Sequence, residues 1–270
     1  MSDANSGWSY VSIEKTGRVA VVRYDRGDRV NALSLRGIRE LTEAAEWIRA
    51  DHDIFSVALV GGETAFSAGR DLKDPEMDAR RNAPLLQRRY VAGAGARLCR
   101  AWSELEQFTA AGIEGFAIGG GLALAVATDY RVLGRSAHLR APEAALGLSM
   151  SWGSVPRLVN LVGPARAKQI LIHANDRISA EDALAWGLAQ EIVDDGQAAA
   201  AAIAAAQKAA EIPPVAARMI KRAVDAYANA LADAVIHMDT DQVLLAESGA
   251  DHLEAVDAFL AKRDPTFTGA

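Results

Sequence analysis

The stretch EGFAIGGGLALAVATDY, residues 114–130, places three consecutive glycines between a short apolar run and an alanine-rich segment. The apolar run predicts a β-strand and the alanine-rich segment predicts a helix, so the glycines lie where a strand turns into a helix. Glycine at an ordinary helix start costs about 0.5 to 1 kcal/mol relative to alanine. Three together therefore indicate a turn with positive φ or a ligand pressed against the backbone.

A second turn of small residues follows another predicted strand. SVALVGG, residues 56–62, has the character of a buried strand, and the next segment, ETAFSAGRDLKD, delivers Ser67, Ala68 and Gly69. Two backbone N–H groups directed at one point form an oxyanion hole, which stabilises a carbonyl oxygen that gains negative charge. We interpret the two turns as halves of one such site, the alternative being two unrelated tight turns.

Other site motifs fit less well. Gly119 and Gly121, with Glu143 about twenty residues further on, resemble a dinucleotide fingerprint, but Leu124 occupies its third small position. The five histidines are scattered without metal-ligand spacing, so no metal site is expected. The single cysteine, Cys99, has no partner for a disulfide or a thiolate metal site.

Length and charge restrict the class of protein. A chain of 270 residues is long enough for one domain with an appendage. It contains no apolar run of about 18 residues and begins without a basic, apolar leader, so we expect a soluble, cytoplasmic protein and no membrane partner. The net charge of −6 argues against a nucleic-acid partner and makes any phosphate contact a local one.

The pattern of elements predicts an α/β fold. Residues 10–25 predict a hairpin around Gly17, and a helix is expected from Leu35 with Ser34 as its N-cap. Residues 70–84 suggest a mobile loop or partly frayed helix, and residues 85–107 a single helix. From about residue 198 the chain is alanine-rich and helical, with a break at 213–214, and should pack against the core or a partner subunit.

Several ordered stretches resemble the crotonase, or enoyl-CoA hydratase/isomerase, superfamily over nearly the whole chain. They are RVNALS, AFSAGRDL, EGFAIGGGLALAVATDYRV, APEAALGL, VPRLVNLVG, RISAEDALAWGLAQEIV and AFLAKRDPTF. The resemblance implies an α/β crotonase-like spiral of ββα units in residues 1–195, holding the acyl-CoA site. It implies a C-terminal helical trimerisation region in residues 196–270, and hence a homotrimer or hexamer.

The resemblance also implies residue roles. The oxyanion N–H groups would belong to Arg70 and Gly120, and Glu143 would be the acid/base, with a pKa raised by an apolar pocket. Ala123 stands where two-glutamate hydratases have their other glutamate. Coenzyme A enters only as part of the thioester substrate, with no permanently bound cofactor. It would contact four residues, Arg29 and Ala68 in one subunit and Phe259 and Lys262 from a neighbour.

One glutamate fits an enoyl-CoA isomerase, in which a single carboxylate moves a proton through an enolate. Hydration, or a hydratase-lyase reaction like that of hydroxycinnamoyl-CoA enzymes, is the alternative within the family. A noncatalytic scaffold that binds coenzyme A or RNA is the alternative from another class. Ser149, Ser151 and Trp152 are interpreted as pocket wall.

Overall fold

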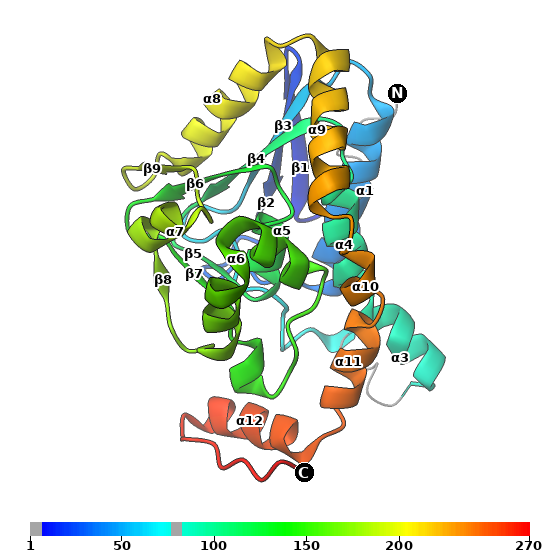
Figure 1. Ribbon diagram of the computed structural model, residues 1–270, viewed down its shortest axis with the longest axis vertical. Helices are drawn as coiled ribbons and strands as arrows, with labels where there is room; N and C mark the ends of the chain where they lie inside the picture. The colour runs from blue at the N-terminus through cyan, green and yellow to red at the C-terminus, as the bar shows by residue number, and fades with distance from the viewer. Residues whose placement is uncertain (1–6, 77–82) are drawn as a thin grey trace.

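A six-stranded sheet forms the centre of the computed structural model, which describes residues 7–76 and 83–270 (Figure 1). The strand order is β1-β2-β3-β4-β6-β9. β1 and β2 form the predicted antiparallel hairpin, and the other neighbouring strands are parallel. The strands are β1 (Val11–Thr16), β2 (Val19–Tyr24), β3 (Ser56–Val60), β4 (Phe108–Ile113), β6 (Tyr130–Gly134) and β9 (Glu191–Val193).

A smaller sheet is built from segments that leave the main one. β5 (Phe116–Ile118) follows β4 and pairs in parallel with β7 (His138–Arg140), which follows β6. β8 (Ile178–Ser179) completes this sheet. A helical segment follows each pair of strands, α5 (Gly120–Ala125) after β5 and the 3₁₀-helix η1 (Glu143–Leu146) after β7. The expected spiral of ββα units is thereby confirmed.

Helices cover both faces of the main sheet. α1 (Leu35–Ala50) and α4 (Ala94–Ser103) share the largest core cluster with Leu59 of β3, whereas the adjacent Ala58 packs with Ala206 of α8 (Ala198–Ala210). Successive strand side chains point to opposite faces, so α8 lies on the face opposite α1. Ser34 caps α1 as predicted, accepting a hydrogen bond of 3.1 Å from Gly37 N–H.

The alanines of α8 allow a very close approach to the sheet. Ala198, Ala202 and Ala206 recur at every fourth position and are fully buried. A Cβ added to Gly112 in β4 would lie 2.6 Å from the Ala198 carbonyl oxygen. Small residues in the helix and in the strand thus bring the two backbones together. Of the two partners expected for this alanine-rich segment, the core or another subunit, α8 packs against the core.

The single helix expected over residues 85–107 is two helices. α3 (Leu85–Ala92) ends at Gly93, α4 follows, and residues 104–107 lead into β4. Glycine is an unfavourable helix residue, and at Gly95 a Cβ would lie 1.8 Å from the Trp152 ring, so that position excludes a side chain. Residues 77–82 of the expected loop lie outside the described residues.

The remaining helices pack against one or other of the two sheets or against neighbouring helices. α8 and α9 are separated by the predicted break at Pro213, and Lys221 of α9 donates a hydrogen bond of 2.6 Å to Asp129. α10, α11 and α12 then run past α6, α3 and η1 (Figure 1). These elements are α6 (Ser154–Ile172), α7 (Ala180–Trp186), α9 (Pro214–Ala228), α10 (Asp233–Ile236), α11 (Asp239–Ala246) and α12 (Ala250–Ala261). Within residues 7–76 and 83–270, no helix is long and apolar enough to cross a membrane.

Candidate active site

The two turns singled out in the sequence lie side by side. Ser67 accepts a hydrogen bond of 2.9 Å from Ile118 N–H through its carbonyl oxygen, which joins the segment after β3 to β5. Gly69 has a φ of 81°, and a Cβ there would lie 2.4 Å from the Ile118 oxygen and 2.9 Å from Gly120 N. The backbone around residues 69–70 is therefore in direct contact with the start of α5, and only glycine fits between them.

Each of the three consecutive glycines makes room for a different neighbour. A Cβ at Gly119 would lie 2.7 Å from Glu143 Oε1. A Cβ at Gly120 would lie 2.5 Å from the Trp152 ring, and a Cβ at Gly121 would lie 2.6 Å from the Ser67 carbonyl oxygen. Gly119 also has a φ of 53°. In the part of the chain that the structure describes, no group accepts a hydrogen bond from Gly120 N–H. The glycines thus assemble a carboxylate, an indole ring and a second loop around one backbone position.

Glu143 is a carboxylate with an unusual environment. It begins η1 directly after Pro142, and although part of the residue is exposed, its Oε2 is buried and accepts no hydrogen bond from the described residues. Burial raises the pKa of Glu143 from 4.5 to about 7, with Arg140 opposing the change. The predicted raised pKa is confirmed, and a group with this pKa both accepts and donates protons near neutral pH.

Ala123, at the position expected for a second glutamate, has only a methyl side chain. Ala123 lies in α5, where it is 1% exposed and belongs to the main core cluster. Its N–H donates to the Gly119 carbonyl oxygen at 2.9 Å, as a regular helix residue. Ala123 therefore brings no acid/base group to Glu143.

Arg70 is held through both its backbone and its side chain. Leu33 pairs with the two residues that flank Arg70. Its N–H donates to the Gly69 oxygen at 2.7 Å, and its carbonyl oxygen accepts from Asp71 N–H at 2.9 Å. The guanidinium forms an ion pair of 3.0 Å with Glu247, directly after α11. Sequence reasoning missed Glu247, because its separation from Arg70 leaves no local signal.

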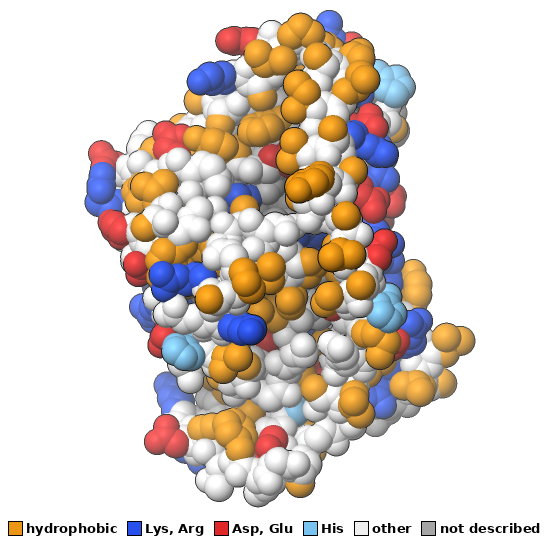
Figure 2. Space-filling view, in the orientation of Figure 1, with side chains coloured by type: hydrophobic (Ala, Val, Ile, Leu, Met, Phe, Trp, Pro, Cys, Tyr) orange, Lys and Arg blue, Asp and Glu red, His pale blue; other side chains and the backbone are white. Residues whose placement is uncertain are grey.

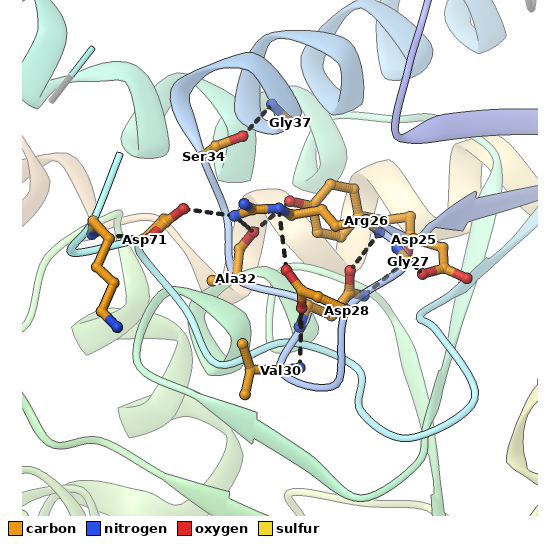
Figure 3. Close-up of polar contacts among 12 residues, drawn as sticks. Asp25, Arg26, Gly27, Asp28, Val30, Ala32, Ser34, Gly37 and Asp71 are labelled. Carbon is orange, nitrogen blue, oxygen red and sulfur yellow. Dashed lines mark hydrogen bonds and ion pairs between the residues drawn. The ribbon is translucent and has the colours of Figure 1, made fainter. Parts of the chain in front are cut away.

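A polar cluster around Arg26 fixes the loop that precedes α1 (Figure 3). Arg26 Nη1 donates to Asp71 Oδ2 at 2.6 Å and to the Ala32 oxygen at 3.0 Å, and its Nε lies 3.5 Å from Asp28. The buried amide of Asn31 donates to two backbone oxygens at 2.8 and 2.9 Å, one of them directly before Ser67. These positioning residues were also missed; the motif RVNALS contains Asn31 but gives no sign of its partners.

The candidate coenzyme A residues fall into two groups. Ala68 N–H donates to the Val30 oxygen at 2.9 Å, which brings Ala68 beside the loop that carries the exposed Arg29. Phe259, 60% exposed, and Lys262 lie at the end of α12. No hydrogen bond or ion pair among the described residues joins these two groups.

Trp152 forms a wall of the site. It has a φ of 60°, and its ring fills the space that side chains at Gly95 and Gly120 would occupy. Ser149 Oγ donates to the Met150 oxygen at 3.4 Å, and the Ser151 oxygen accepts from Ser154 Oγ. These contacts give Trp152 a packing role and the two serines backbone contacts. Among the described residues, no cluster of His, Cys, Asp or Glu could hold a metal ion.

Comparisons with known proteins identify a family and a shared fold. Residues 14–270 match the family described as Enoyl-CoA hydratase/isomerase. The short-chain-enoyl-CoA hydratase of Clostridium acetobutylicum is 31% identical over 94% of this chain and 95% of its own length. The 1,2-epoxyphenylacetyl-CoA isomerase of Escherichia coli is 31% identical over 93% of this chain and 95% of its own length. A crystal structure of an enoyl-CoA hydratase from Mycobacterium avium subsp. paratuberculosis has the same fold, with a TM-score of 0.85, 24% identity, and coverage of 97% of this chain and 99% of that one.

Proposed function

The chain belongs to the enoyl-CoA hydratase/isomerase family, whose enzymes act on acyl-CoA, and we propose that it isomerises enoyl-CoA thioesters with Glu143 as a proton shuttle. The observation that carries this proposal is the buried Glu143 carboxyl, with a pKa of about 7, against Gly119 at the start of α5. A single group that both accepts and donates a proton is what an isomerase needs.

In the proposed reaction three groups act on the thioester. The N–H groups of Arg70 and Gly120 donate to the thioester oxygen of a 3-enoyl-CoA. The Glu143 carboxylate removes the α-proton, and the electron pair moves onto the thioester oxygen as an enolate, stabilised by the two donors. Glu143 then returns the proton to the γ-carbon as the electrons move back, which leaves the double bond conjugated with the thioester.

The test uses a 3-enoyl-CoA of six carbons in deuterated water, with product analysis by mass spectrometry. We expect conversion to the 2-enoyl-CoA with substantial retention of the substrate's own proton, because one carboxylate carries it from carbon to carbon. Glu143→Gln should lower the rate about 10²- to 10⁴-fold. Turnover of the Gln variant at the wild-type rate would contradict the role of Glu143.

Hydration is the second candidate, supported by the similarity to the hydratase of Clostridium acetobutylicum. A carboxyl with a pKa of about 7 also suits activation of water. Crotonyl-CoA decides between the two, since a hydratase adds water to it and an isomerase does not. Hydration faster than isomerisation of the 3-enoyl-CoA would favour the second candidate.

We also propose how coenzyme A is held. Arg29 binds its phosphates and the Ala68 backbone meets its adenine, a placement supported by the bond between Ala68 and Val30. Phe259 and Lys262 reach the coenzyme A of a neighbouring subunit, where Lys262 acts as a point charge on a phosphate. Lys262→Ala should raise KM more than it lowers kcat, with a weaker dependence of binding on salt.

The proposed assembly is a trimer or a pair of trimers formed through residues 196–270, beyond a core of residues 1–195. Figure 2 shows hydrophobic side chains in a row along α9. None of the α9 residues is buried, and an exposed apolar face of this kind is typical of a protein interface. The apolar residues along it are Val215, Met219, Ile220, Val224 and Tyr227, which are 60–90% exposed.

A further inference from the structure

A cavity of about 330 Å³ adjoins the candidate active site through Trp152. The cavity is lined by α3, α4, the start of α6 and the segment from α10 to α11. Trp152 lines this cavity and also touches Gly120. The indole ring is therefore shared between the cavity and the turn that would hold the thioester.

The Trp152 ring is fixed between two helices. Gly95 and Gly120 lack side chains where the ring packs against them, so the indole is held between α4 and α5. The same ring contacts Gly120, beside which the proposed thioester would lie, and lines the cavity that contains Arg97 and Arg157.

Arginine side chains dominate the charge of the cavity. Of the four arginines that line it, Arg89 is neutralised by Asp241 at 2.6 Å, and Arg100 approaches two carboxylates at 3.7 and 3.9 Å. Arg97 and Arg157 form no ion pair within 4 Å with any described residue. Among the described residues, neither arginine therefore has a counter-ion within 4 Å, and the Asp239 and Glu104 carboxylates act on Arg157 only from a greater distance.

The contacts of Arg157 are all with neutral groups. Its Nη1 donates to the carbonyl oxygens of Trp152 and Gly153 at 3.1 and 2.9 Å, and its Nη2 donates to Ser103 Oγ at 2.8 Å. The nearby Asp239 carboxylate is engaged by Gly153 N–H at 2.7 Å. Burial lowers the pKa of Arg157, so an anion in the cavity would stabilise its charged form.

Arg97 lies at the more exposed side of the same cavity. Its guanidinium stacks over the Tyr90 ring, 4.4 Å from the centroid, and Nη2 donates to the Tyr90 oxygen at 3.0 Å. Stacking fixes the plane of the guanidinium and leaves its edge for hydrogen bonding. An oriented guanidinium edge is suited to a carboxylate, which accepts two parallel hydrogen bonds.

On the basis of the proposed acyl-CoA function, we infer that the preferred acyl group carries a carboxylate at the end remote from the thioester, and that Arg97 and Arg157 bind it. The chemical class is an ω-carboxyacyl thioester of coenzyme A. The chain of such a compound runs along the Trp152 indole, and its carboxylate pairs with the two guanidinium groups.

Binding of two saturated thioesters of equal length tests this inference without any reaction. Isothermal titration calorimetry compares hexanoyl-CoA with its six-carbon ω-carboxy counterpart. We expect the ω-carboxy compound to bind at least about tenfold more tightly, in the range of hydrogen bonds to charged groups. Equal or weaker binding of the ω-carboxy compound by the wild-type protein would overturn the inference.

Substitutions assign the preference to the two arginines. In Arg97→Gln the ratio of the two dissociation constants should fall towards one, and Arg157→Gln should do the same. Arg135→Gln removes an exposed arginine at another surface and should leave the ratio unchanged. If Arg157→Gln fails to fold, the assignment is tested with Arg97→Gln alone. An Arg97→Gln variant that keeps the wild-type ratio of the two dissociation constants would contradict the assignment. Turnover of 3-enoyl-CoA is measured separately, so its absence bears on the proposed reaction while the binding ratio decides the carboxylate site.

Discussion

Replacing Glu143 by glutamine should make the protein more stable while it removes activity. The pKa of about 7 lies about 2.5 above the ordinary value of 4.5, which corresponds to about 3 kcal/mol against the ionised form. Glu143 is partly exposed, so solvent screening reduces the expected gain to about 1–2 kcal/mol. Glutamine has the same shape and no charge, and it therefore relieves this cost.

The gain should depend on pH in a defined direction. Between pH 4.5 and 7 the folded protein binds more protons at Glu143 than the unfolded chain does, so stability falls as the pH rises. The advantage of Glu143→Gln should be close to zero near pH 4.5, grow through this interval, and reach its full value above pH 7.

Thermal unfolding at a low and a high pH provides the assay. For a chain of this size, 1–2 kcal/mol corresponds to a rise in Tm of roughly 2–8 °C. The exposed Glu211 provides a matched control, since Glu211→Gln changes the same chemical group without burial. An identical stability difference at both pH values, or a loss of stability above pH 7, would refute this account of Glu143.

Four further changes test other parts of the structure. Gly119→Ala places a Cβ 2.7 Å from Glu143 Oε1 in a backbone with positive φ, so kcat should fall about 100-fold in a variant that remains folded by circular dichroism. Asn31→Ala removes the buried donor to two backbone oxygens and should lower the free energy of unfolding by about 2–3 kcal/mol in urea titrations. Ala123→Glu should speed hydration of crotonyl-CoA if the missing carboxylate limits it; no gain in a folded variant would assign the limit to pocket shape. Met219→Asp should lower the oligomer mass measured by light scattering, and an unchanged mass would exclude the α9 face as the interface.

Local sequence signals predicted much of the fold. The hairpin, the Ser34 cap of α1 and the break at Pro213 each depend on residues adjacent in the chain, and the structure has all three. The division between α3 and α4 was not predicted, because helical periodicity across residues 85–107 outweighed single glycines. In the structure, Gly95 takes part in packing the Trp152 ring, a contact that the spacing does not reveal.

The candidate site shows the same division between local and distant contacts. The direction of the Glu143 pKa change was predicted, because the family resemblance places this carboxyl beside an apolar pocket. The ion pair of Arg70 with Glu247 and the charges around Arg157 were not predicted, since they depend on where distant helices come together. Folding, rather than any motif, decides which of the many arginines meet a carboxylate.

The ion pair between Arg70 and Glu247 joins two segments that are 177 residues apart. If an acyl-CoA holds the backbone at Arg70, it also restrains α11, and by thermodynamic linkage an ordered α11 must favour the bound ligand by the same free energy. Amide hydrogen exchange in α11 should therefore slow when coenzyme A thioester is added, although α11 need not touch the ligand. Glu247→Gln should weaken this protection while leaving the amides of β3 and β4 as slow as before.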